Sequence, residues 1–168
     1  MAITIQPGTV IISAPALADP QFEKAVILIT EYNENGATGF VINKPFHRKF
    51  NELTEFMHSK PFTLYTGGPV DTENLFMLHQ RSDLIKGGKY VSGNIYFGGD
   101  FQQAVRYMND GSINSAGIKL FIGYCGWDAG ELEAEVEEGS WLVTEEKGSI
   151  VFEKEDVEWE QLLKKLQQ

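Results

Sequence analysis

The sequence is poor in cysteine and in long apolar runs. Cys125 is the one cysteine among 168 residues, so no disulfide can form within the chain, which suits a reducing compartment. No run of about 20 apolar residues occurs, so we expect no membrane-spanning helix. Residues 1–6 carry neither the basic stretch nor the long apolar run of a secretory signal. We therefore expect a cytoplasmic protein.

Positive charge is also scarce. The chain has 14 Lys and Arg against 24 Asp and Glu, a net charge of -10. Residues 128–168 alone hold 13 acidic and 4 basic side chains. Proteins that bind nucleic acids place Lys and Arg against the phosphates, so direct nucleic-acid binding is disfavoured. The densest basic run, residues 44–49, is of a kind that usually faces water.

Metal and nucleotide motifs are missing. His47, His58 and His79 show no helical pairing, and neither HExxH nor CxxC occurs. The glycine pairs at 67–68 and 98–99 are not followed by the GKS or GKT of a phosphate loop. The sequence therefore predicts no metal and no cofactor.

Apolar patterning predicts one α+β domain over residues 1–168, with a mixed, mostly antiparallel sheet. An Asn-Gly pair at 35–36 indicates a hairpin. Strands are expected at 9–12, 26–30, 39–42, 62–65, 75–79 and 118–122. A helical turn is expected after Asp19 and a short helix over 51–57. Two longer helices are expected, one that begins at Asp100, where Asp100 and Gln103 form a capping box, and one that begins at Asp156.

The acidic stretch 131–137 admits two interpretations. It alternates polar and apolar residues as a strand does, but Glu and Ala are poor strand formers. Asp128 and Glu131 have the spacing of a capping box, which favours a helix from Ala129. We therefore predict a helix that carries Glu131 and Glu135 on one face.

The segment 123–128, Gly-Tyr-Cys-Gly-Trp-Asp, has the composition of a tight turn between a strand and a helix. Tyr124 and Trp127 are aromatic residues with one polar group each, suited to line a groove together with Asn43 and His79. The alternative is that the aromatics only pack the core. Cys125 occupies the place of the nucleophile in the Gly-x-nucleophile-x-Gly pattern of a nucleophile elbow, and His79 is the candidate base. The final glycine of that pattern is replaced by Trp127.

Several motifs in order resemble the AlgH/YqgE family of bacterial proteins. They are the run 8–22 with Ser-Ala-Pro-Ala-Leu at 13–17, Gly-Phe-Val-Ile-Asn-Lys-Pro at 39–45, Gly-Gly-Pro-Val at 67–70, Leu-His at 78–79, the run 123–135, Trp-Leu at 141–142 and the helix around Trp159. The resemblance implies a bacterial cytoplasmic protein whose bent, bifurcated sheet forms a pseudo-barrel with flanking helices. It implies no known reaction, only a label of transcriptional regulator from a genetic role in alginate production. Where this chain has Cys125 the family usually has alanine, and where it has Glu131 the family usually has glutamine.

Three functional hypotheses remain. The first is a non-catalytic regulatory or binding protein that meets a protein or small molecule through Asn43, His79, Tyr124, Trp127, Glu131 and Glu135. The second is a small hydrolase-like enzyme that uses Cys125 or His79. The third is direct DNA binding, against which the charge argues.

Overall fold

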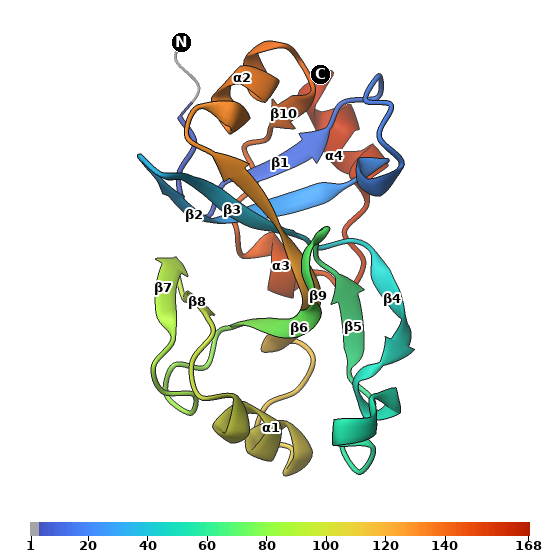
Figure 1. Cartoon of the computed structure of the whole chain (residues 1–168), viewed down its shortest axis with the longest axis vertical. Helices are drawn as coiled ribbons and strands as arrows, with labels where there is room; N and C mark the ends of the chain where they lie inside the picture. Colours follow the sequence, from blue (N-terminus) through green and yellow to red (C-terminus); the bar gives the residue numbers. More distant parts are fainter. Residues whose placement is uncertain (1–3) are drawn as a thin grey trace.

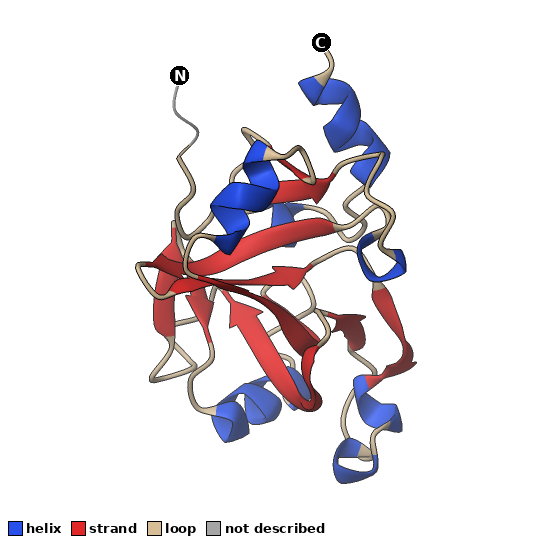
Figure 2. Cartoon of the chain, turned by 45° about the horizontal axis from the view of Figure 1, so that its top comes forward, coloured by secondary structure: helices blue, strands red, loops and turns tan. Residues whose placement is uncertain are grey.

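A computed structural model describes residues 4–168; residues 1–3, part of the N-terminal stretch without a signal pattern, lie outside the described residues. The chain forms a ten-stranded sheet with four α-helices around it (Figures 1 and 2). The strands are β1 Val10–Ser13, β2 Val26–Asn33, β3 Gly36–Val41, β4 Pro45–Lys49, β5 Thr63–Thr66, β6 Val70–His79, β7 Lys89–Ser92, β8 Ile95–Phe97, β9 Ile118–Asp128 and β10 Trp141–Val143.

The helices are short and lie at the ends and edges of the sheet. They are α1 Phe101–Asn109, α2 Glu131–Glu137, α3 Ile150–Glu153 and α4 Trp159–Leu166, with 3-10 turns at Pro20–Phe22, Phe50–Glu52 and Thr54–Phe56. No helix within residues 4–168 is long and apolar enough to cross a membrane.

Strand β9 holds the two halves of the sheet together. Its first part pairs with β6 and, in parallel, with β5, while its last part, Cys125 to Asp128, pairs antiparallel with β3. The strand order is β10-β1-β2-β3-β9-β6-β8-β7, and β4 and β5 branch off at β9. Figure 1 shows β9 crossing from the upper to the lower half. The expected α+β class and bifurcated, mostly antiparallel sheet are confirmed. The expected pseudo-barrel does not close, because β10 and β7 end the strand order without pairing with each other.

The predicted hairpin of β2 and β3 is confirmed. Asn33 accepts a hydrogen bond from the Asn35 N–H at 2.8 Å, and Gly36 has a positive φ of 131°. A side chain at Gly36 would collide with the Trp127 carbonyl oxygen. The glycine therefore serves the close approach of β3 to β9 as well as the turn.

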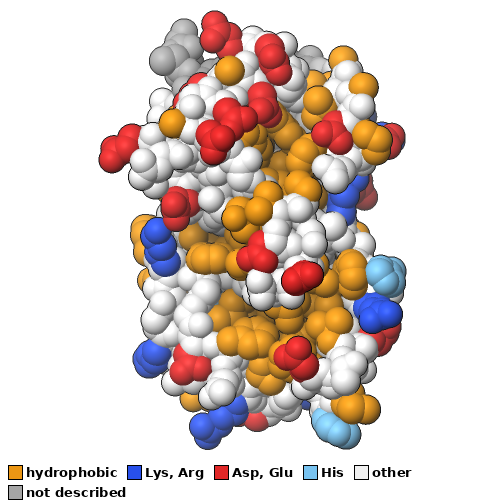
Figure 3. Space-filling model, viewed as in Figure 1, with side chains coloured by type: hydrophobic (Ala, Val, Ile, Leu, Met, Phe, Trp, Pro, Cys, Tyr) orange, Lys and Arg blue, Asp and Glu red, His pale blue; other side chains and the backbone are white. Residues whose placement is uncertain are grey.

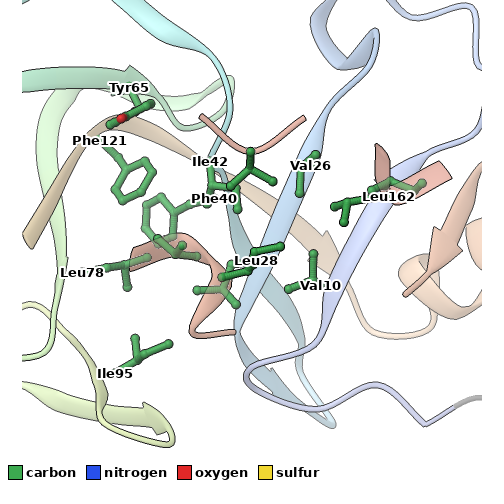
Figure 4. Packing of buried hydrophobic residues seen from close by; sticks show 14 of the residues in the cluster. Val10, Val26, Leu28, Phe40, Ile42, Tyr65, Leu78, Ile95, Phe121 and Leu162 are labelled. Atoms are coloured by element: carbon green, nitrogen blue, oxygen red, sulfur yellow. The ribbon is translucent and has the colours of Figure 1, made fainter. Parts of the chain in front are cut away.

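Three clusters of buried side chains make up the core. β1 and β2 are buried on both faces, because Val10, Val26 and Leu28 enter one cluster while Ile11 and Ile27 enter another. A strand covered on both faces reads as a continuous apolar run, which explains why both strands were predictable. Figure 4 shows the first cluster, in which Phe40 packs against Phe121 with ring centroids 5.0 Å apart. The third cluster lies against α1.

The predicted start of α1 is only half right. The Asp100 side chain accepts a hydrogen bond from the Gln103 N–H at 3.0 Å, as an N-cap does. The Gln103 side chain does not return to Asp100 but accepts from the Lys86 N–H at 2.9 Å. Ala104 and Met108 are buried and hold the helix against the third core cluster.

Other predicted boundaries were wrong. The helix expected over 51–57 is a pair of 3-10 turns. The last helix begins at Trp159 rather than at Asp156, because Val157 inserts into the core and the backbone at Glu158 is extended. Four strands and α3 were not predicted. These elements are short: β10 pairs with the distant β1 and β4 with β5, while β7 pairs with its neighbour β8 and α3 buries Ile150 and Val151.

We predict that Gly123→Ala destabilises the protein far more than Gly130→Ala. Both glycines have positive φ, at 75° and 83°. A Cβ at Gly123 would lie 2.3 Å from the Gly68 carbonyl oxygen, while one at Gly130 meets nothing within 4 Å. Thermal or urea unfolding should show a loss of more than about 3 kcal/mol for Gly123→Ala against about 1 kcal/mol for Gly130→Ala. Equal losses would refute the backbone-contact explanation.

Candidate functional site

The segment 123–128 is a strand, not the predicted turn. β9 continues through it to Asp128 and pairs with β3. Gly123 has φ 75°, and the pairing with β6 shifts register nearby, between Val70 and Leu75. As a result Phe121 and Tyr124 both pack in the first core cluster, while Cys125 and Trp127 pack in the second. Gly123 therefore serves close packing of two backbones rather than a reversal of the chain.

The predicted helix at 131–137 is confirmed, but its cap differs. Gly130 occupies the N-cap position with a left-handed backbone, and no side chain caps the helix there. Glu131 accepts a hydrogen bond from the Asp128 N–H at 2.7 Å. The glutamate half of the predicted capping box therefore forms, whereas the Asp128 half does not.

A hollow of about 380 Å³ lies between α2, the end of β9 and the start of β10. Figure 3 shows it as an apolar depression bordered by acidic side chains. Its lining is Leu17, Asp19, Phe22, Pro69, Val70, Cys125, Gly126, Trp127, Glu131, Glu135, Glu138, Ser140 and Trp141. This hollow is our candidate site.

Glu135 ties the two indoles of the hollow together. Its Oε1 accepts hydrogen bonds from the Trp127 Nε1–H at 3.1 Å and from the Trp141 Nε1–H at 2.9 Å. Both tryptophans are buried, and their rings meet edge to face with centroids 6.1 Å apart. Phe22 packs edge to face on Trp141 at 5.4 Å. A carboxylate that accepts two buried N–H groups fixes both rings, so the aromatic floor is rigid.

The charge around the hollow has one sign. Asp19, Glu131, Glu135 and Glu138 line it, and no described lining residue is Lys or Arg. Glu138 accepts a hydrogen bond from the Ser140 hydroxyl at 2.8 Å, which orders the rim. Carboxylates above an aromatic floor attract a cation and repel an anion.

Three of the six predicted site residues meet at this hollow, namely Trp127, Glu131 and Glu135. Tyr124 does not join them, because it lies in the other core cluster and packs edge to face on Phe76 at 5.5 Å. Of the groove predicted from Asn43, His79, Tyr124 and Trp127, only Trp127 lines this hollow.

Asn43 and His79 serve the backbone instead. Asn43 accepts from the Val26 N–H and donates to the Lys24 carbonyl, both at 2.9 Å. His79 is fully buried; its Nδ1 accepts from the Arg81 N–H at 3.2 Å, so Nε2 carries the proton and donates to the Gly98 carbonyl at 3.0 Å. Burial lowers the pKa of His79 and keeps the ring neutral.

Cys125 lies with its thiol turned into the protein. It is 2% exposed, and its Sγ donates to the Gly67 carbonyl oxygen at 3.4 Å. Burial raises the pKa of Cys125 to about 12. A thiol with this pKa stays protonated near neutral pH and is a poor nucleophile. Cys125 and His79 pack in different parts of the protein and do not form a nucleophile–base pair.

Sequence reasoning missed Trp141 and Phe22 as parts of the site. Both come from segments distant in sequence, Phe22 from a 3-10 turn and Trp141 from β10, which pairs with β1. Both residues lie in motifs of the family resemblance, the run 8–22 and Trp-Leu at 141–142, but no local pattern places them beside Trp127. Within residues 4–168 no group of three His, Cys, Asp or Glu side chains has the arrangement of a metal site.

The fold and the hollow together define a small α+β protein built on a bent, bifurcated sheet. The model of the AlgH-like family matches residues 10–168, and the chain belongs to this family. The resemblance found in the motifs is thereby confirmed.

Relatives support the same assignment. A UPF0301 protein of Chlorobaculum tepidum is 38% identical over 148 residues, which cover 88% of this chain and 79% of the relative. A UPF0301 protein of Bacteroides thetaiotaomicron is 35% identical and covers 95% of this chain and 82% of its own length. The solution structure of the AlgH protein from Pseudomonas aeruginosa superposes with a TM-score of 0.73 at 27% identity, covering 99% of this chain and 90% of that one. A crystal structure from Corynebacterium diphtheriae, 22% identical with a TM-score of 0.75 over 98% of this chain and 89% of that one, shares the fold.

We predict that Glu135→Ala lowers the free energy of unfolding by about 2–4 kcal/mol, because it leaves two buried indole N–H groups without an acceptor. Glu135→Gln keeps an acceptor oxygen and should lose less than half of that amount. Glu137→Ala, on the same helix but exposed, is the matched control and should change stability by less than about 0.5 kcal/mol. Chemical unfolding measures all three, and equal effects of the two alanine variants would contradict the structural role of Glu135.

We also predict that the Cys125 thiol is unreactive in the folded protein. With a pKa of about 12 and a buried sulfur, iodoacetamide at pH 8 should leave it unmodified for hours. The same reagent in denaturant should modify it within minutes, which is the control for thiol integrity. Rapid alkylation of the native protein, followed by mass spectrometry, would instead restore Cys125 as a nucleophile.

Proposed function

We propose that this protein is a non-catalytic binding protein whose hollow under α2 takes a cationic group, such as the arginine or lysine side chain of a partner protein. The observation that carries the proposal is the pairing of a rigid aromatic floor with an all-acidic border. Trp127 and Trp141 line the hollow, and Glu135 fixes both rings through their indole N–H groups. A guanidinium group over such a floor gains from both the rings and the carboxylates.

The volume and the charge suit a side chain better than a whole ligand of drug size. About 380 Å³ is at the lower end of small-molecule sites, so a single side chain with its flanking backbone would fill it. Val70 at the border is 39% exposed and offers an apolar contact to the stem of a long basic side chain. This geometry supports recognition of a basic segment in a protein.

A catalytic alternative draws no support from the site. The hydrolase hypothesis rested on Cys125 and His79, and both are buried with their polar atoms engaged in hydrogen bonds to the backbone. The border carboxylates have ordinary partners, such as Ser140 for Glu138. We therefore propose binding rather than turnover.

We place this role in the cytoplasm, because the one cysteine is a free, buried thiol that a reducing compartment preserves. The transcriptional-regulator label that the family resemblance carries fits an action through protein contact. A net charge of -10 argues against contact with DNA.

Indole NMR signals provide the test. The chain has three tryptophans, and Trp159 does not line the hollow: it packs in the first core cluster and donates its Nε1–H to the Ser13 carbonyl at 2.8 Å. Titration with N-acetyl-arginine amide should shift the indole signals of Trp127 and Trp141, with a dissociation constant at or below about 5 mM, and leave Trp159 unmoved. N-acetyl-glutamate amide, of opposite charge, should shift none of them.

Matched variants separate charge at the border from charge elsewhere on α2. Glu131→Gln with Glu138→Gln removes two border charges and keeps the acceptor oxygens, so arginine binding should weaken at least about fivefold. Glu133→Gln with Glu137→Gln removes the same charge from positions that do not line the hollow and should leave binding within about twofold. Indole signals that do not respond to arginine, or equal weakening by both double variants, would overturn the proposal.

A further inference from the structure

A second hollow, of about 240 Å³, lies at the other half of the molecule, beside the first part of β9. It is bounded by β5 and β9 on one side and by the segment after α3 on the other. Its lining is Phe62, Thr63, Tyr65, Ser115, Ala116, Ile118, Lys119, Phe152, Glu153, Lys154 and Glu155. It shares no lining residue with the hollow under α2.

Lys119 is the unusual residue of this second hollow. It is only 5% exposed, yet it lines the space, and no described carboxylate lies within the 4.0 Å of an ion pair with it. Its Nζ reaches the Tyr65 hydroxyl and the Lys154 carbonyl, each at 3.5 Å, which is the outer limit of a hydrogen bond. By comparison, the exposed Lys165 makes an ion pair at 2.8 Å with Glu146. The buried amine of Lys119 therefore has longer hydrogen bonds than the exposed amine of Lys165.

Tyr65 stands directly against this amine. The Lys119 Nζ lies 4.8 Å from the centre of the Tyr65 ring as well as 3.5 Å from its hydroxyl oxygen. Tyr65 is itself buried and packs on Phe121 in the first core cluster. The phenol therefore has a fixed position beside the amine, from which it can give or take a proton.

Burial shifts the pKa of both groups, and the lowered pKa of Lys119 favours the neutral amine that can attack a carbonyl group. Desolvation lowers the pKa of Lys119, while the carboxylates of Asp156 and Glu155 act in the opposite sense. Desolvation and then the same two carboxylates raise the pKa of Tyr65. A larger share of the amine is thus neutral than on a surface lysine, and the phenol keeps its proton.

The charge of the surroundings selects the ligand. Glu153 and Glu155 line the hollow together with one further cation, Lys154, and Asp156 acts electrostatically on Lys119, so the carboxylates around the amine outnumber Lys154 and disfavour an anion. An uncharged carbonyl compound meets no such penalty, and the apolar walls of Phe62, Ile118 and Phe152 suit a short carbon chain.

We propose that Lys119 forms a reversible imine with a small, uncharged aldehyde or ketone bound in this hollow. The neutral amine nitrogen attacks the carbonyl carbon, a C–N bond forms, and the former carbonyl oxygen takes a proton from the Tyr65 hydroxyl. The nitrogen proton of the resulting carbinolamine adduct returns to Tyr65. Tyr65 then protonates the hydroxyl group, which leaves as water, and the remaining nitrogen proton of the iminium ion returns to the Tyr65 phenolate. One carbonyl compound and one amine thus yield one imine and one water, without any redox change.

Reductive trapping tests the proposal in the intact protein. Butanal with sodium cyanoborohydride at pH 7.5 converts an imine to a stable amine, which peptide mass spectrometry locates. At short times Lys119 should be modified at least about tenfold faster than the exposed lysines 49, 60 and 89. Labelling of Lys119 at or below the rate of these surface lysines would overturn the proposal.

Two comparisons sharpen the result. Tyr65→Phe keeps the ring in the core and removes the hydroxyl, so it should slow the labelling of Lys119 at least about fivefold and leave the surface lysines unchanged. Glyoxylate, an anionic aldehyde, should label Lys119 more slowly than butanal does. Equal rates for the variant and the wild type, or faster labelling by glyoxylate, would contradict the assigned roles of Tyr65 and of the carboxylates.

Discussion

The structure depends on one strand that belongs to two groups of strands. β9 pairs with β5 and β6 along its first part and with β3 along its last part, so both halves of the sheet are fixed to one backbone. The change of partner occurs at Gly123, where the backbone approaches Gly68 so closely that neither position has room for a Cβ. At Gly123 the alternation of side chains along β9 shifts, so that Phe121 and Tyr124 both enter the first core cluster while Cys125 and Trp127 enter the second. One hollow is lined by residues of β9 before this point and the other by residues after it.

This constraint explains what the sequence could and could not reveal. The apolar strands around Ile11, Ile27 and Leu120 were predictable because burial on both faces gives them an unmistakable composition. The glycines of 123–128 were taken for a turn because local composition cannot distinguish a chain reversal from two backbones in close contact. The second backbone, Gly67-Gly68, is more than 50 residues away in the sequence and becomes a neighbour only in the fold. The same non-local pairing explains why β10 was missed.

The candidate site was predictable where its residues are close in sequence and not where distant segments meet. Trp127, Glu131 and Glu135 lie close together in sequence and meet in the fold as the helical spacing required. Trp141 reaches them through the pairing of β10 with β1, which no local pattern indicates. Asn43 and His79 were attractive because polar side chains beside apolar strands often bind ligands. They turned inward instead, since the backbone at strand ends needs hydrogen-bond partners wherever water is excluded.

Two charged side chains, the partly exposed Glu135 and the buried Lys119, show how structure and function divide in this protein. Glu135 accepts two short hydrogen bonds from buried indoles, and its interactions are largely internal, so its role in the hollow is to hold the floor in place. Lys119 is more deeply buried, and its amine has two hydrogen bonds at the 3.5 Å limit and a contact with the Tyr65 ring at 4.8 Å. Burying an amine this way costs free energy that a methionine or leucine of similar volume would not cost. Packing alone therefore does not account for a lysine at this position of β9, and the imine chemistry that we propose for its nitrogen would account for it.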